Sequence, residues 1–332
     1  MNLAILGAGA WGTALAIALS PRHRVRLWGR NAVQVQEMAE QRVNTRYLPG
    51  ISIADCVVLT AALPSALEGA NLILCGVPTN ALRDTLRLVA RLAPQSPVIW
   101  ACKGFEKTTG KLPHQIAAEE LGDGFRCGVL SGPSFAEEVA EGKPTALTLA
   151  SADAECARHF ARELHSTRLR VYSSDDVTGV ELGGAVKNVI AIAAGISDGL
   201  GLGNNARAAL ITRGLAETTR LGIKLGGHLE TFMGLTGLGD LVLTTTGELS
   251  RNRRVGLALA RGESVATILH QLGHVAEGVY TAPEVARIAK ALDVEMPITD
   301  AVCSLIDGKF SAASVVEALM RRDPKAEQIL RR

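Results

Sequence analysis

The sequence is short of aromatic residues, of excess charge of either sign and of long apolar runs. Aromatic residues make up 4% of the 332 residues, and 35 basic residues against 33 acidic ones leave a net charge of +2. This balance argues against a general binder of nucleic acid or membrane surfaces, which needs a strongly basic face. Beyond the N-terminus the longest apolar run, 189–196, is too short to cross a bilayer. We therefore expect a soluble protein with no nucleic-acid partner and no stable membrane insertion.

Cysteine pairing and metal-ligand spacing are also lacking. The six cysteines include no C-x-x-C pair, and no Cys/His cluster has zinc-finger spacing. This pattern predicts reduced thiols in a cytoplasmic protein, with no metal site. The apolar stretch 3–19 resembles a signal-peptide core, but no Lys or Arg precedes it and its glycines are regularly spaced.

Apolar residues and glycine are plentiful, at 47% of the chain and 34 residues respectively, which excludes a disordered protein. Apolar strand-like runs alternate with amphipathic helical stretches as far as residue 172, and the pattern is helical from about residue 180. The strand-like runs are 2–6, 25–28, 72–77, 98–101, 128–130, 146–149 and 169–172. We expect an α/β Rossmann domain with a doubly wound, mostly parallel sheet over 1–178, followed by an all-α domain over 179–332.

The first thirty residues contain a G-x-G-x-x-G motif between a buried strand, 2–6, and an Ala/Leu-rich helix, 13–19. In this context Gly7 allows a tight turn, Gly9 lets backbone amides reach a pyrophosphate, and Gly12 permits close helix–strand packing. The alternative is a glycine-rich turn in an α/β sheet that binds nothing. The correct flanking elements favour dinucleotide binding.

The residue that follows the second strand bears on the choice of dinucleotide. An NAD-specific site places an acidic residue here for the ribose 2′-hydroxyl, but this sequence has Arg30, and the first acid is Glu37. A guanidinium suits a 2′-phosphate, so we expect NADPH to be accepted at least as well as NADH. A solvated surface arginine is the alternative.

Polar residues also follow three later strands, at 78–80, 102–104 and 131–134, at the edge where ligands of open α/β sheets bind. Lys103 follows an apolar run, which puts its ammonium at the cofactor crevice, and a solvated loop lysine is the alternative. Ser134 to Glu137 fits a helix-capping box, and a helix start at the crevice also presents amides to a polar ligand.

The segment 181–195 predicts a buried helix with a lysine in its middle. On that helix Lys187 has Gly183, Gly184 and Ala191 as same-face neighbours, so this face has little bulk and has room for a small ligand. Desolvation there would lower the pKa of the amine and make it a general base. The alternative is a lysine that extends to solvent at a domain edge.

Two further segments suit anions. Asp240 ends a glycine-rich loop, where it is either a site carboxylate or the N-cap of a helix over 241–246. Ser250, Arg251 and Asn252 together offer bidentate and neutral donors to a phosphate, whereas Arg253 and Arg254 fit a solvated basic turn.

These segments occur in one order, and together they resemble the bacterial-type NAD(P)-dependent sn-glycerol-3-phosphate dehydrogenases over essentially the whole chain. The matching segments are 7–14, 103–104, 131–136, 183–189, 237–241 and 250–253. One departure is Cys102, where the family has Thr or Ser before the Lys-Gly pair. The resemblance implies a cytoplasmic homodimer that makes glycerol 3-phosphate for phospholipid biosynthesis.

The resemblance also implies roles for individual residues. Lys187 matches the proton acceptor for the C2 hydroxyl of the substrate. Matches to substrate contacts are Lys103, Gly132, Ser134, Lys187, Asp240, Ser250, Arg251 and Asn252. Matches to dinucleotide contacts are Ala10, Trp11, Arg30, Lys103, Ala136, Arg251, Val275 and Glu277.

Two other functions remain open from the sequence. A β-hydroxyacid dehydrogenase also has a Rossmann domain, a helical domain and a lysine with a nearby asparagine, but it binds a carboxylate and does not need the 250–252 cradle. A non-catalytic NADP sensor would use the same crevice, but it needs no base at Lys187.

Overall fold

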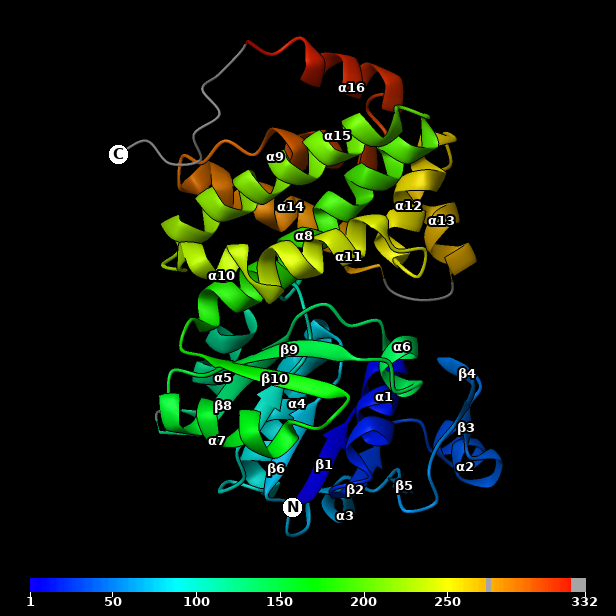
Figure 1. Cartoon of the computed structure of the whole chain (residues 1–332), viewed down its shortest axis with the longest axis vertical. Coiled ribbons are helices and arrows are strands. Elements are labelled where there is room, and N and C mark those ends of the chain that lie inside the picture. Colours follow the sequence, from blue (N-terminus) through cyan, green and yellow to red (C-terminus); the bar gives the residue numbers. More distant parts are fainter. Residues whose placement is uncertain (123, 273–275, 324–332) are drawn as a thin grey trace. The chain divides into compact units, whose positions relative to one another are not determined.

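The computed structural model describes residues 1–122, 124–272 and 276–323 (Figure 1). These residues form two compact units. The first comprises 1–106 and 111–177, and the second comprises 107–110 and 178–332, of which 178–272 and 276–323 are described. The short segment 107–110 lies within the sequence-predicted first domain but groups with the helical unit.

Eight of the described strands form one sheet in the first unit (Figure 1). Its order is β10-β9-β8-β7-β6-β1-β2-β5, and every neighbouring pair is parallel except β8 and β9, which are antiparallel. The strands are β1 (Asn2–Leu6), β2 (Arg24–Trp28), β5 (Val58–Thr60), β6 (Leu72–Cys75), β7 (Val98–Trp100), β8 (Cys127–Ser131), β9 (Thr145–Ala150) and β10 (Leu169–Ser174).

The order of the sheet reverses between β1 and β6. The chain runs outward from β1 to β2 and β5, then returns to β6 and continues on the other side. Four of the five residues of β1 and all four of β6 are buried, as expected for central strands covered on both faces. A reversal of this kind is where open α/β sheets bind their ligands, at the carboxyl ends of the strands.

Helices alternate with the strands of this unit. They are α1 (Ala10–Leu19), α2 (Ala32–Gln41), α3 (Leu63–Leu67), α4 (Thr79–Leu92), α5 (Pro113–Leu121), α6 (Ala136–Ala140) and α7 (Ala154–Leu164). A separate antiparallel pair, β3 (Val43–Asn44) and β4 (Leu48–Ser52), and the short β5 were not predicted from the sequence. β3 and β5 are too short to show a period, and β4 contains Pro49 and Gly50.

All the regular secondary structure among the described residues of the second unit is helical (Figure 1). Its elements are α8 (Val177–Gly199, whose first residue is assigned to the first unit), α9 (Gly203–Lys224), α10 (Leu229–Met233), the π-helical turn η1 (Leu235–Gly239), α11 (Asp240–Thr246), α12 (Arg251–Ala260), α13 (Val265–Leu272), α14 (Glu277–Ala291), α15 (Pro297–Ile306) and α16 (Ala312–Met320).

The helix α8 is the central element of the second unit. By length and apolarity it is the one described helix that fits a membrane span, but its apolar window is entirely buried in the protein. Burial on all sides explains why its sequence is apolar all round rather than along a single stripe.

Candidate active site

The glycine-rich turn between β1 and α1 lies at the point where the sheet order reverses. Gly7 has a φ of +113°, and a Cβ there would lie 2.9 Å from the backbone of Gly76, which directly follows β6. A Cβ on Gly12 would lie 1.9 Å from the carbonyl oxygen of Gly7. At Gly9, by contrast, a Cβ would meet nothing within 4 Å. The turn is therefore closed at its first and third glycines and open at its second.

The open side of this turn fits a pyrophosphate. Gly9 is the N-cap of α1, it makes no side-chain cap bond, and the first turn carries no acidic residue. Uncapped amides at a helix N-terminus attract an anion through their N–H groups and the helix dipole. Ala10 and Trp11 form this first turn, and Trp11 shares an apolar cluster with Ala136, the first residue of α6.

Two side chains that the sequence did not single out hold the turn in place. Asn44 is fully buried, and its Nδ2 donates to the Ala8 carbonyl at 3.1 Å and to Thr13 Oγ1 at 2.8 Å. Gln34 Nε2 donates to the same Ala8 carbonyl at 3.1 Å. The Ala8–Gly9 peptide is thus fixed from behind, away from the open side. No local sequence signal indicates this, because Asn44 reaches the turn only through tertiary packing.

Arg30 lies just after β2 and is exposed. The preceding Gly29 has no room for a side chain, because a Cβ there would lie 2.7 Å from Val35 and 2.9 Å from Ala8. Asn31 caps α2 by accepting from the Gln34 amide. The strand end therefore presents a guanidinium, with no carboxylate at Gly29 or Asn31, which suits a ribose 2′-phosphate.

Hydrogen bonds to two carbonyls link the carboxyl ends of three strands of the first unit. Lys103 Nζ, after β7, and Ser134 Oγ, after β8, each donate to the Gly132 carbonyl at 3.0 Å. Thr79 Oγ1, after β6, donates to the Lys103 carbonyl at 3.3 Å. The structure thus brings Lys103, Gly132 and Ser134 together. The predicted capping box is wrong, because α6 has Phe135 as its N-cap and makes no side-chain cap bond.

In the second unit, Lys187 lies in the middle of α8 and is 8% exposed. Its Nζ donates to Asp240 Oδ1, in an ion pair whose carboxylate is fully buried, and to Thr244 Oγ1 at 2.8 Å. Thr244, which sequence reasoning missed, lies one turn after Asp240 on α11. The sequence predicts burial of this amine, and the structure adds an ion pair with Asp240 that the local pattern did not indicate.

The low-bulk face of α8 is filled by protein at Gly183. A Cβ there would lie 2.5 Å from the carbonyl oxygen of Thr236 in η1. The expectation that this part of the face holds a ligand is therefore wrong. The glycine instead allows the η1 backbone to approach α8, and η1 leads directly into Asp240. Close backbone packing is what brings the carboxylate to the lysine.

Two of the purely structural alternatives from the sequence, for Asp240 and for Arg253, are also wrong. Gly239, rather than Asp240, is the N-cap of α11, and Asp240 lies in its first turn. Arg253 is not a solvated turn residue, because its Nε donates to Asp198 Oδ2 at 2.8 Å. That ion pair ties α12 to the end of α8 and leaves Arg254 exposed.

The start of α12 is built from the predicted Ser-Arg-Asn segment. Ser250 is the N-cap and accepts from the Arg253 amide at 3.2 Å. Asn252 Nδ2 donates to Asn188 Oδ1 at 2.9 Å, and Asn252 Oδ1 accepts from the Gly278 amide at 3.0 Å. Because Asn188 follows Lys187 directly, this hydrogen bond joins α8 beside its lysine to the segment 250–252, which is predicted to bind phosphate.

Arg251 and Glu277 begin α12 and α14. Arg251 is exposed and makes no hydrogen bond or ion pair with the described residues. A cation at a helix N-terminus is unfavourable by itself and becomes favourable when an anion binds there. Burial raises the pKa of Glu277 to about 7, against the opposing effect of the Arg251 charge. Val275, a predicted dinucleotide contact, lies outside the described residues.

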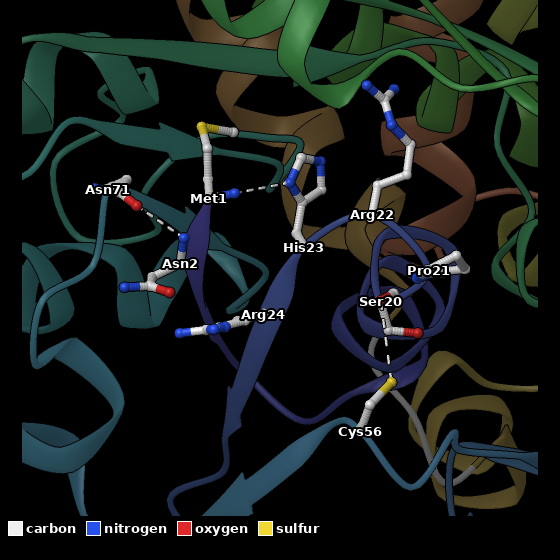
Figure 2. Close-up of a pocket in the computed structure, with 9 residues that line it drawn as sticks. All are labelled: Met1, Asn2, Ser20, Pro21, Arg22, His23, Arg24, Cys56 and Asn71. Carbon is white, nitrogen blue, oxygen red and sulfur yellow. Dashed lines mark hydrogen bonds between the residues drawn. The ribbon is translucent and has the colours of Figure 1, made fainter.

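The first unit also has a surface hollow that lies away from its candidate site residues (Figure 2). It lies at the amino ends of β1 and β2, where the Met1 amino group is 3.4 Å from His23 Nδ1. None of the candidate residues lines it. Among the described residues, no group of three or more His, Cys, Asp or Glu side chains is placed to hold a metal.

Known proteins match this chain over nearly its whole length. The model of the NAD-dependent glycerol-3-phosphate dehydrogenase N-terminus matches residues 2–157, and that of the C-terminus matches 176–317. The glycerol-3-phosphate dehydrogenase (NAD(P)+) of Nitrosospira multiformis is 58% identical over 331 residues, covering 98% of this chain and 99% of the relative. That of Dechloromonas aromatica is 56% identical over 327 residues, covering 98% and 99%.

A solved structure agrees with these matches. The crystal structure of glycerol-3-phosphate dehydrogenase from Coxiella burnetii has a TM-score of 0.92 at 43% identity, and the match covers 97% of this chain and 99% of that one. Fold, glycine-rich turn and relatives together define a pyridine-nucleotide-dependent oxidoreductase acting on a CH–OH group. The chain belongs to the NAD-dependent glycerol-3-phosphate dehydrogenase family. The predicted family, fold class and use of NAD or NADP are confirmed.

Proposed function

We propose that this chain reduces dihydroxyacetone phosphate to sn-glycerol 3-phosphate, reversibly, with NADPH or NADH. The observation that carries the proposal is the hydrogen bond between Asn188 and Asn252. It holds a buried, ion-paired amine next to a helix start that presents an exposed arginine. A phosphorylated ketone needs a proton donor for its carbonyl oxygen and an anion site for its phosphate, and these residues supply both.

The residues of the helical unit have separate tasks. When bound, the nicotinamide supplies the hydride to the carbonyl carbon. The Lys187 ammonium, stabilised by Asp240, donates a hydrogen bond to the ketone oxygen and then gives it a proton. In the oxidation direction the neutral amine accepts that proton. Arg251 and the first turn of α12 bind the phosphate, which holds the reacting carbon in position. Ser250 and Asn252 complete this substrate-binding set.

The first unit supplies the rest of the proposed site. Lys103, Gly132 and Ser134 bind the substrate, and Lys103 also contacts the dinucleotide. Gly7, Gly9, Ala10, Trp11, Gly12, Arg30 and Ala136 bind the dinucleotide, with Arg251, Val275 and Glu277 from the second domain. We propose the division into a dinucleotide domain, 1–178, and a substrate domain, 179–332, on this basis. The proposal extends to a cytoplasmic homodimer without membrane insertion that supplies phospholipid biosynthesis.

A comparison of ketones tests the proposed reaction. Absorbance of NADPH, and separately of NADH, is followed with dihydroxyacetone phosphate and with unphosphorylated dihydroxyacetone. We expect rapid oxidation with the phosphorylated ketone only, because Arg251 recognises the phosphate. Equal rates with both ketones would contradict the phosphate site. No oxidation with either, despite tight NADPH binding, would favour a β-hydroxyacid dehydrogenase or a dinucleotide sensor.

A further inference from the structure

The loop that carries Lys103 is attached at two points to the start of α4. Thr79, the first residue of α4, donates from Oγ1 to the Lys103 carbonyl at 3.3 Å. Arg83 lies one turn later on the same helix face. Its Nε and Nη2 donate to the two carboxylate oxygens of Glu106, each at 2.8 Å. Two neighbouring positions of one helix thus hold both ends of the segment 103–106.

The second attachment is a bidentate ion pair between Arg83 and Glu106. Glu106 is 4% exposed, and a buried carboxylate requires a partner of opposite charge. Arg83 satisfies it in the bidentate geometry that only a guanidinium provides. The third arm of Arg83, Nη1, contacts Glu120 at 2.6 Å and Glu119 at 2.8 Å on α5. The guanidinium is therefore fixed from both sides.

A strong attachment is needed here because of where the chain goes next. Residues 107–110 belong to the helical unit, in which Lys107 Nζ lies 5.2 Å from the centre of the Tyr280 ring. The Glu106 amide donates to the Lys111 carbonyl at 2.9 Å, which closes the base of this excursion. Residue 107 lies only four positions after Lys103. If Glu106 were not held, a movement of 107–110 would therefore displace Lys103.

We propose that Arg83 and Glu106 form a positioning pair that fixes the ammonium of Lys103 on its site, with Thr79 as the second support. The inference rests on the proposed function of Lys103 as a contact to substrate and dinucleotide. Arg83 and Glu106 touch neither ligand in this account. They act through Lys103 alone, and that property makes the pair testable.

The test measures kcat and KM for dihydroxyacetone phosphate in Arg83→Met, Glu106→Gln and the double variant. We expect kcat/KM to fall about 10- to 100-fold in each single variant, the range that follows from a misplaced catalytic-site group. The double variant should lose no more than either single one. The matched control is Arg87→Met, which removes a bidentate ion pair from Arg87 to Glu120 on the same helices but does not touch the loop. It should stay within about twofold of the wild type.

A second cycle separates positioning from general stability. In a Lys103→Ala background, Arg83→Met should cause no further loss, because no ammonium remains to be positioned. A full additional loss in that background, or wild-type kcat/KM in a folded Glu106→Gln variant, would overturn the proposal. If Arg83→Met fails to fold, Thr79→Val and the charge-free double variant take its place.

Failure of the proposed function and failure of the Arg83–Glu106 proposal give different results. A wild-type protein inactive on dihydroxyacetone phosphate would contradict the function. The pair is then judged by the NADPH dissociation constant, measured by fluorescence. That constant should rise in Arg83→Met and stay unchanged in Arg87→Met, and equal values in both would overturn the pair.

Discussion

At the scale of single residues, Lys187 is held between two opposing influences. Its burial favours the neutral amine, and the buried Asp240 carboxylate favours the ammonium. Thr244 donates to the Asp240 carbonyl at 2.6 Å and thereby keeps its own oxygen directed at the amine. The orientation of the lysine is thus fixed by protein contacts before any substrate binds.

Arg30 carries the expected acceptance of NADPH. In Arg30→Ala we expect KM for NADPH to rise by about 10-fold or more, since a charge-assisted hydrogen bond to phosphate contributes about 1.5–3 kcal/mol. KM for NADH should change little, because that dinucleotide has no 2′-phosphate. The control is Arg24→Ala, which removes an exposed arginine at the opposite end of β2. An equal change for both dinucleotides in Arg30→Ala would contradict the assignment.

At the scale of elements, contacts between backbones set the site of the helical unit. A Cβ on Gly195 would lie 2.0 Å from the Arg253 carbonyl, and one on Gly256 would lie 2.0 Å from the Ile192 carbonyl. These two glycines let α8 and α12 cross with their backbones in contact. The contact at Gly183 does the same for η1. Asp240 and Asn252 reach α8 because small residues allow their elements to approach.

A buried carboxylate joins two further helices of this unit. Glu217 on α9 is 1% exposed and accepts from the amides of Ile298 at 2.7 Å and Thr299 at 3.3 Å, in the first turn of α15. It therefore satisfies orphan donors at a helix start from a neighbouring helix. Burial nevertheless raises the pKa of Glu217 to about 7.

This raised pKa predicts a pH-dependent stability. Glu217 binds its proton more tightly in the folded protein than in the unfolded chain, where the pKa of this carboxyl is 4.5. The contribution of the protonated Glu217 side chain to the free energy of unfolding is therefore complete below pH 4.5, and it is lost as the pH rises through about 7. Relative to wild type, the free energy of unfolding of Glu217→Gln should increase over this range by up to about 3 kcal/mol. Urea titrations at several pH values measure it, and parallel curves for the two proteins would contradict the shift.

The sequence predicted the parts of this structure that depend on local periodicity. The strands 2–6, 25–28, 72–77, 98–101, 128–130, 146–149 and 169–172 all match observed strands to within a few residues at each end, because buried strands need continuous apolar runs. The Gly-rich turn and the helix around Lys187 follow from the same signals. The hydrogen-bond and ion-pair partners of the site residues cannot be predicted from these local signals. The contacts of Asn44 to Ala8, Arg83 to Glu106 and Arg253 to Asp198 join residues 23 to 55 positions apart.

The η1 turn shows the same limit for an element. Its residues, Leu235–Gly239, contain two glycines and predict an irregular loop. The turn packs closely against Gly183 of α8, and a Cβ on Gly237 would lie 2.0 Å from the Phe232 carbonyl. A conformation fixed by packing partners leaves no local pattern. The sequence alone therefore leaves Asp240 as either a site residue or an N-cap.

At the scale of the whole molecule, the chain passes between the two units three times, at 106/107, 110/111 and 177/178. The proposed reaction transfers a hydride and a proton at adjacent atoms of one substrate, and it requires the glycine-rich turn of the first unit and Lys187 of the second. Each unit alone offers half of this chemistry. The segment 107–110, which belongs to the second unit, begins four residues after Lys103.

The most direct test of this account is single-turnover hydride transfer in Lys187→Ala. Stopped-flow absorbance of NADPH follows one turnover with saturating dihydroxyacetone phosphate, and fluorescence gives the NADPH dissociation constant of the same sample. We expect hydride transfer to slow by at least about 100-fold, the usual contribution of a positioned acid–base group, with NADPH affinity near that of the wild type. Wild-type transfer in this variant would contradict the role of Lys187.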